Sequence, residues 1–368
     1  MSTEYKEVFS VLKNLRGVDA SDQDQYDTNK VSMVEVDPVL IEPFEPGFVD
    51  GYKLATPTGK TINLKEIMDA HIAGENILLV GPSGTGKSTI AFHINDQLNE
   101  KTRDKNREIH SKNVILKSKG EELIPYNELP YGVSHYACHE ATRTEELIGS
   151  ITIKTNDDGT RSPMEVSGAV VEAWTQGKIL ILEEMDFAPP GVWGQTHHFF
   201  DGRTKRTTVY INGPRAIHKH ERFRIIATAN TLGRGENQLE FSGTQLLNMA
   251  FLNRFTYVVK VGFLEADQEI NLITAKSKID KAVAGKMVEA ANKSREMYNN
   301  QTLDTCISTR DLLSWARESV REEKRVGGTT NLSDYWKNIS VPSAYPSFIS
   351  RIADEVSSEA LSKYLSLR

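Results

Sequence analysis

The sequence predicts an α/β fold: a parallel β-sheet flanked by helices, with β-hairpin insertions, followed by an α-helical lid. Three observations support this prediction. A glycine-rich turn joins a short apolar run to an amphipathic pattern between residues 76 and 98, and a second apolar run, residues 179–182, ends in two carboxylates. From Glu265 onward the apolar spacing is helical. Short apolar runs that alternate with helical segments are typical of a parallel sheet.

The composition is that of an ordinary globular chain, with 39% hydrophobic and 26% charged residues among 368. This length allows two or three domains, or one large domain with insertions. No apolar run approaches the ~20 residues that a membrane helix needs, and the first residues show no basic stretch before an apolar core. Two cysteines, Cys138 and Cys306, cannot build a disulfide framework. We therefore expect a cytoplasmic protein with no membrane segment.

Charge patterning suggests how the chain is divided. Residues 1–50 contain eleven acidic and four basic residues, so residues 1–45 are expected to form an acidic flexible segment. An α/β domain is expected over residues 46–262, with an insertion at about 100–129. The helical lid and the C-terminal tail are expected over residues 263–368.

The insertion is basic. Between Lys101 and Lys119 it carries seven Lys or Arg and two acidic residues. We interpret it as a solvated helix and loop; a patch for nucleic acid or an acidic partner is the alternative. The net charge of −6 gives no general case for nucleic-acid binding, so we do not favour a nucleic-acid partner.

The glycine-rich turn matches the phosphate-binding pattern G-x-x-x-x-G-K-[ST]. Its glycines allow N–H groups to close around phosphate oxygens, and the following helix adds free N–H donors. Lys87 is expected to reach the β- and γ-phosphates, and the Ser88 hydroxyl to bind Mg²⁺. The predicted nucleotide-binding residues are Gly81, Pro82, Ser83, Gly84, Thr85, Gly86, Lys87, Ser88 and Thr89.

The second key stretch runs from Lys178 to Glu184. Its four consecutive apolar residues predict a central buried strand. The carboxylates of Glu183 and Glu184 follow at its carboxyl end, which is where open parallel sheets place their ligands.

The remaining elements follow from apolar spacing and from the turn residues that bound each run. They are a helix over residues 63–73, a strand over 133–137, a helix over 166–175, and strands over 223–229 and 257–261. Hairpins are predicted over residues 151–161 and from Arg206 to a turn at Gly213. Ser308 and Asp311 are spaced as a capping box, which predicts a helix that ends near Gly327.

These features occur in an order that resembles the AAA+ ATPases, with their Walker A loop, Walker B strand, sensor 1, arginine finger and sensor 2. Within them the chain is similar to the MoxR branch and above all to the CobS family. The stretch from Ala227 to Gly235 and the later Gly243-Thr244-Gln245 carry that likeness. Residues 137–140 and 146–149 resemble the CbbQ and NorQ activators. The likeness covers about residues 75–275 well and the lid more weakly.

The resemblance implies a role for each matching residue. Glu184 would orient and deprotonate the attacking water, and Asn230, as sensor 1, would polarise it. Arg254 would reach the γ-phosphate of a neighbouring subunit, and Arg310 would contact the nucleotide from the lid. ATP and Mg²⁺ are the implied cofactors.

One position departs from the family pattern, which has Asp-Glu at the strand end where this chain has Glu183-Glu184. Glu183 is expected to hold Mg²⁺, through water, with Asp186 as an alternative residue of the metal shell. His135, Cys138 and His139 lack the second paired ligand set of a zinc site, so we expect no structural zinc there.

The resemblance also implies a homo-oligomeric ring, hexameric in the family, with a CobT-like partner that carries a von Willebrand A domain. Such a ring would remodel or load a partner protein, by cobalt insertion into a corrin ring if the likeness to CobS is literal. Two alternatives stay open. One is a nucleotide-gated scaffold with little hydrolysis, supported by Glu183, and the other is a McrB-like nucleic-acid motor, supported by the basic insertion.

Overall fold

The computed structural model describes residues 52–127, 131–155, 159–231, 245, 247–327, 331–352 and 354–366. The predicted acidic segment 1–45, the hairpin turn 156–158 and residues 232–244 lie outside this part. Its strands are β1 (Tyr52–Ala55), β2 (Ile77–Val80), β3 (Val133–Ala137), β4 (Gly149–Thr155), β5 (Arg161–Ser167), β6 (Ile179–Glu183), β7 (Arg206–Tyr210), β8 (Pro214–His218), β9 (Arg224–Ala229) and β10 (Tyr257–Leu264).

Helices surround and follow these strands. They are α2 (Leu64–Ile72), α3 (Lys87–Lys119), α4 (Thr144–Ile148), α5 (Ala169–Gln176), α6 (Pro190–Thr196), α7 (Met249–Leu252), α8 (Ala266–Ser277), α9 (Lys281–Asn299), α10 (Thr309–Val326), α11 (Leu332–Tyr335), α12 (Val341–Ser347) and α13 (Glu355–Ser366). Short helical turns are η3 (Met185–Phe187), η4 (His197–Phe200), η6 (Trp336–Ser340) and η7 (Ile349–Arg351).

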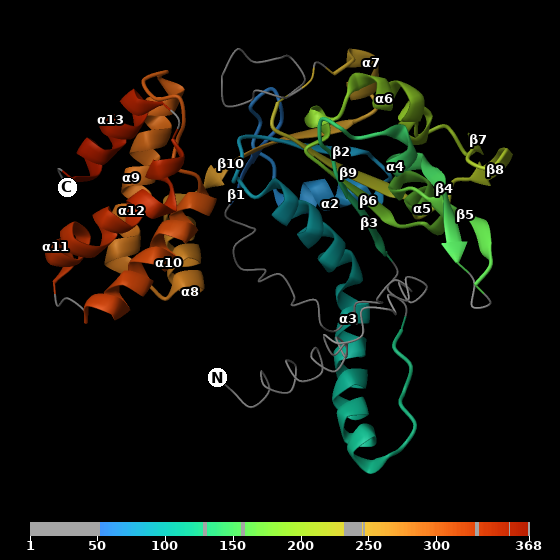
Figure 1. Cartoon of the computed structure of the whole chain (residues 1–368), viewed down its shortest axis with the longest axis horizontal. Helices are drawn as coiled ribbons and strands as arrows, with labels where there is room; N and C mark the ends of the chain where they lie inside the picture. The colour runs from blue at the N-terminus through green and yellow to red at the C-terminus, as the bar shows by residue number, and fades with distance from the viewer. Residues whose placement is uncertain are drawn as a thin grey trace.

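Six strands form one sheet in the order β1-β10-β2-β9-β6-β3. Only β1 runs antiparallel to its neighbour β10, and the other neighbouring pairs in this sheet are parallel. Helices lie on both sides of the sheet, and the group from α8 to α13 lies beside it (Figure 1). The predicted α/β fold with a helical region after it is therefore confirmed.

Alternating side chains of the central strands point to opposite faces of the sheet, so these strands contribute to a hydrophobic core on each face. Ile77 and Leu79 of β2 pack with Ile90 and Ile94 of α3. On the other face, neighbouring residues of the same strands pack with Trp174 of α5 and with residues of α6. Because β2 is buried on both faces, its sequence Ile-Leu-Leu-Val is apolar throughout.

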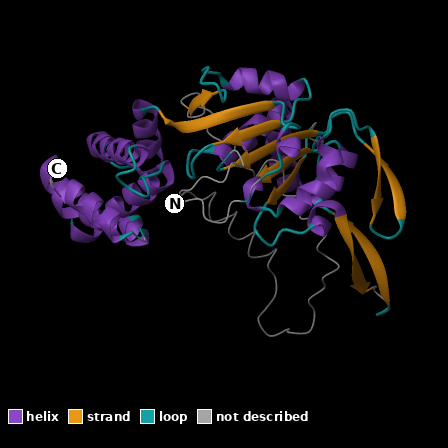
Figure 2. Cartoon of the chain, turned by 90° about the horizontal axis from the view of Figure 1, so that it is seen from above, coloured by secondary structure: helices purple, strands orange, loops and turns teal. Residues whose placement is uncertain are grey.

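Two antiparallel hairpins, β4–β5 and β7–β8, stand outside the main sheet at the side away from the helical region (Figure 2). Both hairpins were expected, but the helix predicted over residues 166–175 begins later. Val166 pairs with Ser150 in the hairpin, and α5 starts at Ala169. The apolar character of Val166 fits either element, so the sequence pattern alone places this boundary poorly.

The basic insertion begins as a continuation of the helix that follows the phosphate loop. α3 is one 33-residue helix, and its second half projects from the body of the molecule (Figure 1). The chain then turns at Gly120 and returns beside the helix. We call residues 99–127, the outer part of α3 and its returning segment, the arm.

Three asparagines spaced seven residues apart hold the returning segment. The side-chain amide of Asn99 both donates to and accepts from the backbone of Tyr131, at 2.7 and 3.0 Å. Asn106 makes the same pair of bonds with Asn127, at 2.9 and 2.8 Å. Asn113 makes it with Ile124, at 2.8 Å for both. All three amides are buried, so this ladder satisfies backbone groups that would otherwise need water.

The helical region has its own core, in which Trp315 and Trp336 are almost fully buried. In the same region Glu269 of α8 is fully buried. It accepts two hydrogen bonds of 2.9 Å from Arg295 and one of 2.6 Å from Thr309. No helix in the described part of the chain has the length and apolarity needed to cross a membrane.

Candidate functional site

The phosphate loop leaves the carboxyl end of β2 and leads into α3. A side chain at Gly81 is excluded, because a Cβ there would lie 2.2 Å from the carbonyl oxygen of Val261. The loop is therefore held close against β10. Ser88 and Thr89 follow Lys87 in the first turn of α3 and are half-buried. The free N–H groups of that turn suit an anion.

Lys87 lies at the centre of the site. Its Nζ atom donates hydrogen bonds to the carbonyl oxygens of Gly81 at 2.6 Å and Pro82 at 2.9 Å, and to Oδ1 of Asn230 at 2.9 Å. The pKa of Lys87 is lowered to about 8, chiefly by burial; nearby carboxylates oppose this shift and the charge of Arg310 adds to it. These three acceptors use all three N–H groups of the ammonium, so a phosphate oxygen would bind Lys87 by replacing one of them.

The two carboxylates at the end of β6 are held by different partners. Glu184 has a left-handed backbone, with φ 53°, and its N–H donates to the Thr228 hydroxyl at 3.0 Å. Alternation along β6 puts Glu183 on the α3 side of the sheet, the side of Ile181. There its Oε2 atom lies 3.4 Å from Nε2 of His135.

The oxygen donors of this site fit Mg²⁺, which prefers a carboxylate or two together with phosphate oxygens and water. Ser88 and Glu183 would supply the protein donors, and the metal would neutralise phosphate charge when bound. Among the described residues no group of three His, Cys, Asp or Glu side chains could hold a metal ion alone. Phosphate oxygens would therefore have to complete the shell.

Asp186, which we expected as an alternative residue of the metal shell, contacts the chain that follows β9. Its Oδ2 atom accepts hydrogen bonds from the backbone N–H groups of Asn230 and Thr231, both at 2.9 Å. The residue is fully buried, and burial raises the pKa of its carboxyl group. Asp186 thus fixes the chain immediately after β9 and with it the backbone of Asn230.

The first turn of α10 reaches the phosphate loop from the helical region. A Cβ at Gly84, which has φ 76°, would lie 2.7 Å from Cβ of Ser308 and 3.7 Å from Cβ of Arg310. Ser308 caps α10 together with Asp311, as predicted. The structure therefore brings Arg310 to the same loop as Lys87.

Arg254 does not join this group. It precedes β10, whose residue Tyr257 pairs with Ile77 at the start of β2. Its carbonyl oxygen accepts from Asn76 Nδ2 at 2.9 Å, and its guanidinium donates to the carbonyl of Ala250. The phosphate loop follows the carboxyl end of β2, whereas Arg254 lies near its amino end, so Arg254 and the loop are at opposite ends of the strands.

Two residues near the site were missed by the sequence analysis. Thr228 was visible as a polar residue within the apolar run of β9, beside the strand that carries both glutamates. His135 was considered only as a metal ligand, yet its neighbour is Glu183. No pattern in the sequence indicates that partnership, because the two residues lie on different strands.

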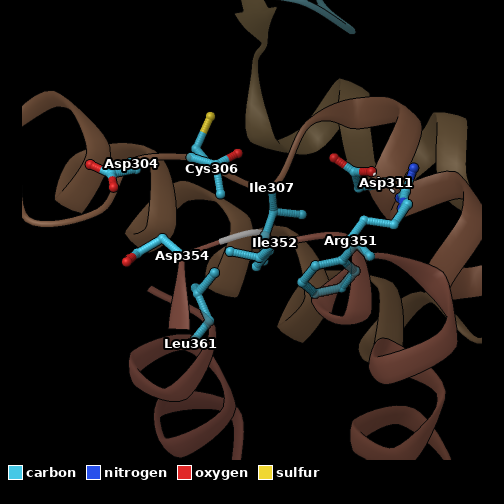
Figure 3. A pocket seen from close by; sticks show the side chains of 10 residues that line it. Asp304, Cys306, Ile307, Asp311, Arg351, Ile352, Asp354 and Leu361 are labelled. Atoms are coloured by element: carbon cyan, nitrogen blue, oxygen red, sulfur yellow. Dashed lines mark hydrogen bonds and ion pairs between the residues drawn. The ribbon is translucent and has the colours of Figure 1, made fainter. Parts of the chain in front are cut away.

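A cavity of about 350 Å³ lies in the helical region rather than at the phosphate loop. Figure 3 shows Asp304 and Asp354 on one side of it and the pair formed by Asp311 and Arg351 on the other. Arg351 Nη2 donates to Asp311 Oδ1 at 2.6 Å, so the cap of α10 forms part of the cavity wall.

Comparison with known proteins supports the expected family. The model for the AAA domain of the dynein-related subfamily matches residues 127–245, and that for the CbbQ/NirQ/NorQ C-terminal region matches 269–320. The aerobic cobaltochelatase subunit CobS of Sinorhizobium sp is 29% identical over 179 residues. Together these matches support an AAA+ protein of the MoxR type, close to CobS and CbbQ. A further model, for magnesium chelatase subunit ChlI, matches residues 57–169 of this AAA+ protein.

The curated relatives are longer than the matched region. The match to CobS covers 47% of this AAA+ protein and 53% of CobS. An uncharacterized Staphylococcus saprophyticus protein is 25% identical over 205 residues, or 56% of this chain and 62% of that protein. The chain thus spans little more than half the length of these relatives.

Solved structures of similar fold include a Thermotoga maritima RuvB variant, with a TM-score of 0.44 and 12% identity over 80% of this chain and 70% of that one. Brucella abortus NtrX in complex with ADP has a TM-score of 0.41 and 16% identity, over 83% of this chain and 67% of that one.

Proposed function

We propose that this AAA+ protein binds ATP with Mg²⁺ and hydrolyses it. The observation that carries the proposal is the convergence on Lys87. Its ammonium is held by two loop carbonyls and by Asn230, which follows β9. The glutamate pair lies at the carboxyl end of β6, the strand next to β9. Phosphoryl transfer depends on positioning and on charge rather than on covalent chemistry of the protein, and these groups supply both.

Each residue has a distinct part in the proposed reaction. Lys87 and the first turn of α3 hold the phosphates, and Arg310 contacts the nucleotide from α10. Glu184 orients the attacking water and takes its proton, while Asn230 polarises that water. Thr228 and Asp186 do not touch the nucleotide in this scheme; they fix the backbones of Glu184 and Asn230.

The test compares nucleotide binding with turnover in single variants. Glu184→Gln should bind ATP with unchanged affinity and lose most turnover, because the amide cannot accept a proton. Lys87→Ala should lose binding as well. Glu221→Gln, an exposed glutamate after β8, serves as a matched control and should behave as the wild type. Wild-type turnover in Glu184→Gln would contradict the assignment. ATP binding without turnover in the wild type would instead favour the scaffold.

We further propose that the protein works as a homo-oligomeric ring, hexameric as in the family, with a partner that carries a von Willebrand A domain. The position of Arg254 supports this, because it lies at the opposite end of β2 from its own phosphate loop, so any contact with a nucleotide would have to be made in a neighbouring subunit. The name of one relative, a cobaltochelatase subunit, suggests metal insertion as the process served. Capture of proteins that bind Glu184→Gln in the presence of ATP would identify the client.

A further inference from the structure

We propose that the arm, residues 99–127, is the docking surface for the acidic N-terminal segment, residues 1–50, of the same chain. The inference does not depend on the proposed ATPase function. It rests on three properties: the arm has a fixed shape, its surface is basic with apolar groups at the tip, and the N-terminal segment has the complementary composition.

The arm has a defined shape because side chains lock its two halves together. Beyond the ladder of Asn99, Asn106 and Asn113, the ring of His110 stacks on that of Tyr126 with centroids 6.4 Å apart. His110 Nδ1 and the Tyr126 hydroxyl also share a hydrogen bond of 2.9 Å. A surface held in this way can bind a segment without first ordering itself.

The tip of the arm exposes apolar side chains. Val114 is 58% exposed, Ile115 55% and Leu123 51%, and no other described residue covers them. Isolated apolar residues are common on surfaces. Here they gather at the end of a projecting element, together with Ile124, where they serve no core. Such clustering marks an interaction site.

The arm is also positively charged. With seven basic and two acidic residues, the stretch 101–119 has a formal charge of +5. Within the described part of the chain, Arg107 pairs with Asp104, whereas Lys105, Lys112, Lys117 and Lys119 form no ion pair. These lysines therefore offer charge that an acidic partner can neutralise.

The N-terminal segment carries the opposite charge and a matching apolar pattern. Residues 1–50, with four basic and eleven acidic residues, have a formal charge of −7. Tyr5, Val8, Leu12 and Leu15 are spaced to form one apolar face if the segment becomes helical. The carboxylates follow this face, nine of them between Asp19 and Asp50 against one lysine. An apolar face followed by an acidic stretch fits an apolar tip beside lysines better than a nucleic acid does, because phosphates offer nothing to the exposed Val114 and Ile115.

The chain is long enough to make this contact. Fifty-one residues precede the first described strand, and an extended chain of that length spans up to roughly 170 Å. The 33-residue helix α3 is about 50 Å long. Residues 1–50 can therefore reach every part of the arm from Tyr52 of their own chain.

The experiment is zero-length carbodiimide cross-linking of the full chain, followed by mass spectrometry. We expect links between arm lysines and carboxylates within residues 1–50. In the triple variant Lys112→Glu, Lys117→Glu and Lys119→Glu, three amines are lost, so the yield is compared at the arm lysines that remain, Lys101 and Lys105. There it should fall roughly tenfold, because three favourable charge pairs become repulsive. The control with the same change of charge, Lys60→Glu, Lys65→Glu and Lys281→Glu, should keep the wild-type yield. Unchanged links in the arm variant would overturn the proposal.

A second variant tests the apolar contact without changing charge. Val114→Ser with Ile115→Ser should lower the cross-link yield and raise amide hydrogen exchange in residues 4–15. Both side chains are exposed, so the melting temperature should stay unchanged. Equal exchange in variant and wild type would overturn the apolar contact.

Mixing ¹⁵N-labelled with unlabelled protein identifies the source of the segment. Links within one isotope only support docking in the same chain. Links that join the two isotopes at the statistical ratio overturn it and assign the arm to a neighbouring copy. Protection of the arm by added duplex DNA, with no link to residues 1–50, also overturns it and assigns the arm to nucleic acid.

Discussion

The backbone N–H of Glu184 donates a hydrogen bond of 3.0 Å to the side-chain oxygen of Thr228 on the neighbouring strand. Glu184 has φ 53° and ψ 43°, a left-handed conformation that costs a residue other than glycine roughly 1–2 kcal/mol. Thr228 is 1% exposed, so this hydrogen bond is shielded from water. The carboxylate proposed as the catalytic base is therefore aimed by a turn that a buried hydroxyl stabilises.

Thr228→Val should slow ATP turnover without weakening ATP binding. Valine keeps the shape of threonine but cannot accept the hydrogen bond, whose loss corresponds to about a tenfold decrease in kcat. Thr228→Ser retains the hydroxyl and should stay close to the wild type. Equal turnover in the valine and serine variants would show that the hydroxyl does not position Glu184.

Arg254→Ala and Lys87→Ala should each be nearly inactive, and a mixture of the two should regain part of the ATPase activity. In a mixed ring, an intact phosphate loop can face an intact Arg254 across a subunit interface. Arginine fingers contribute about 10³–10⁵ in rate, whereas an exposed arginine in a local ion pair contributes about 1 kcal/mol at most. Steady-state ATPase assays at varied mixing ratios measure the recovery. Co-assembly without recovered activity would remove the support for a role between subunits.

Glu269→Gln should destabilise the helical region by about 3–5 kcal/mol, because it leaves the buried Arg295 without its bidentate partner. Urea unfolding followed by circular dichroism measures the change. The double variant Glu269→Leu with Arg295→Met removes both charges and should recover most of the loss. Glu318→Gln, which breaks the exposed pair with Arg321, is the control and should cost about 0.5 kcal/mol or less. A loss no larger than that of the control would contradict the buried-pair argument.

The stability of the protein should fall on acidification because of His71. This residue is fully buried, and burial, helped by the charge of Arg224, lowers its pKa to about 3. Between about pH 3 and 6.5 the unfolded chain binds a proton that the folded chain does not, so stability rises with pH over this range. Going from pH 7 to 5 should therefore cost about 2 kcal/mol through this group.

His71→Leu removes that group and should reduce the difference between the unfolding free energies at pH 7 and pH 5 by the same amount. Urea titrations at the two pH values give both quantities. His218→Leu changes an exposed histidine on β8 and should leave the pH dependence as it is. An equal acid loss in His71→Leu and the wild type would assign the effect to other groups.

Much of the fold could be predicted because its patterns are local. The glycine-rich turn, the apolar run before Glu183 and the capping box at Ser308 each lie within a few residues, and each specifies one conformation. The placement of Lys87, Glu184 and Asn230 around one point then follows from the parallel sheet, whose strand ends meet at one edge.

The features that were missed depend on contacts between distant residues. Nothing near Asn106 indicates that its amide bonds the backbone of Asn127, 21 residues later. From the sequence we therefore interpreted the arm as a solvated helix and loop, although its asparagines recur at a fixed spacing. The same holds for Thr228, whose importance depends on which strand lies beside it.

The continuity of α3 has a mechanical consequence. The helix starts at Lys87 and contains neither glycine nor proline up to Lys119, so it has no hinge of its own. Over its length of about 50 Å, a tilt of about 10° at the phosphate loop would swing the far end through roughly 9 Å. A small rotation of the first turn of α3 would thus move the tip of the arm by more than the length of a side chain.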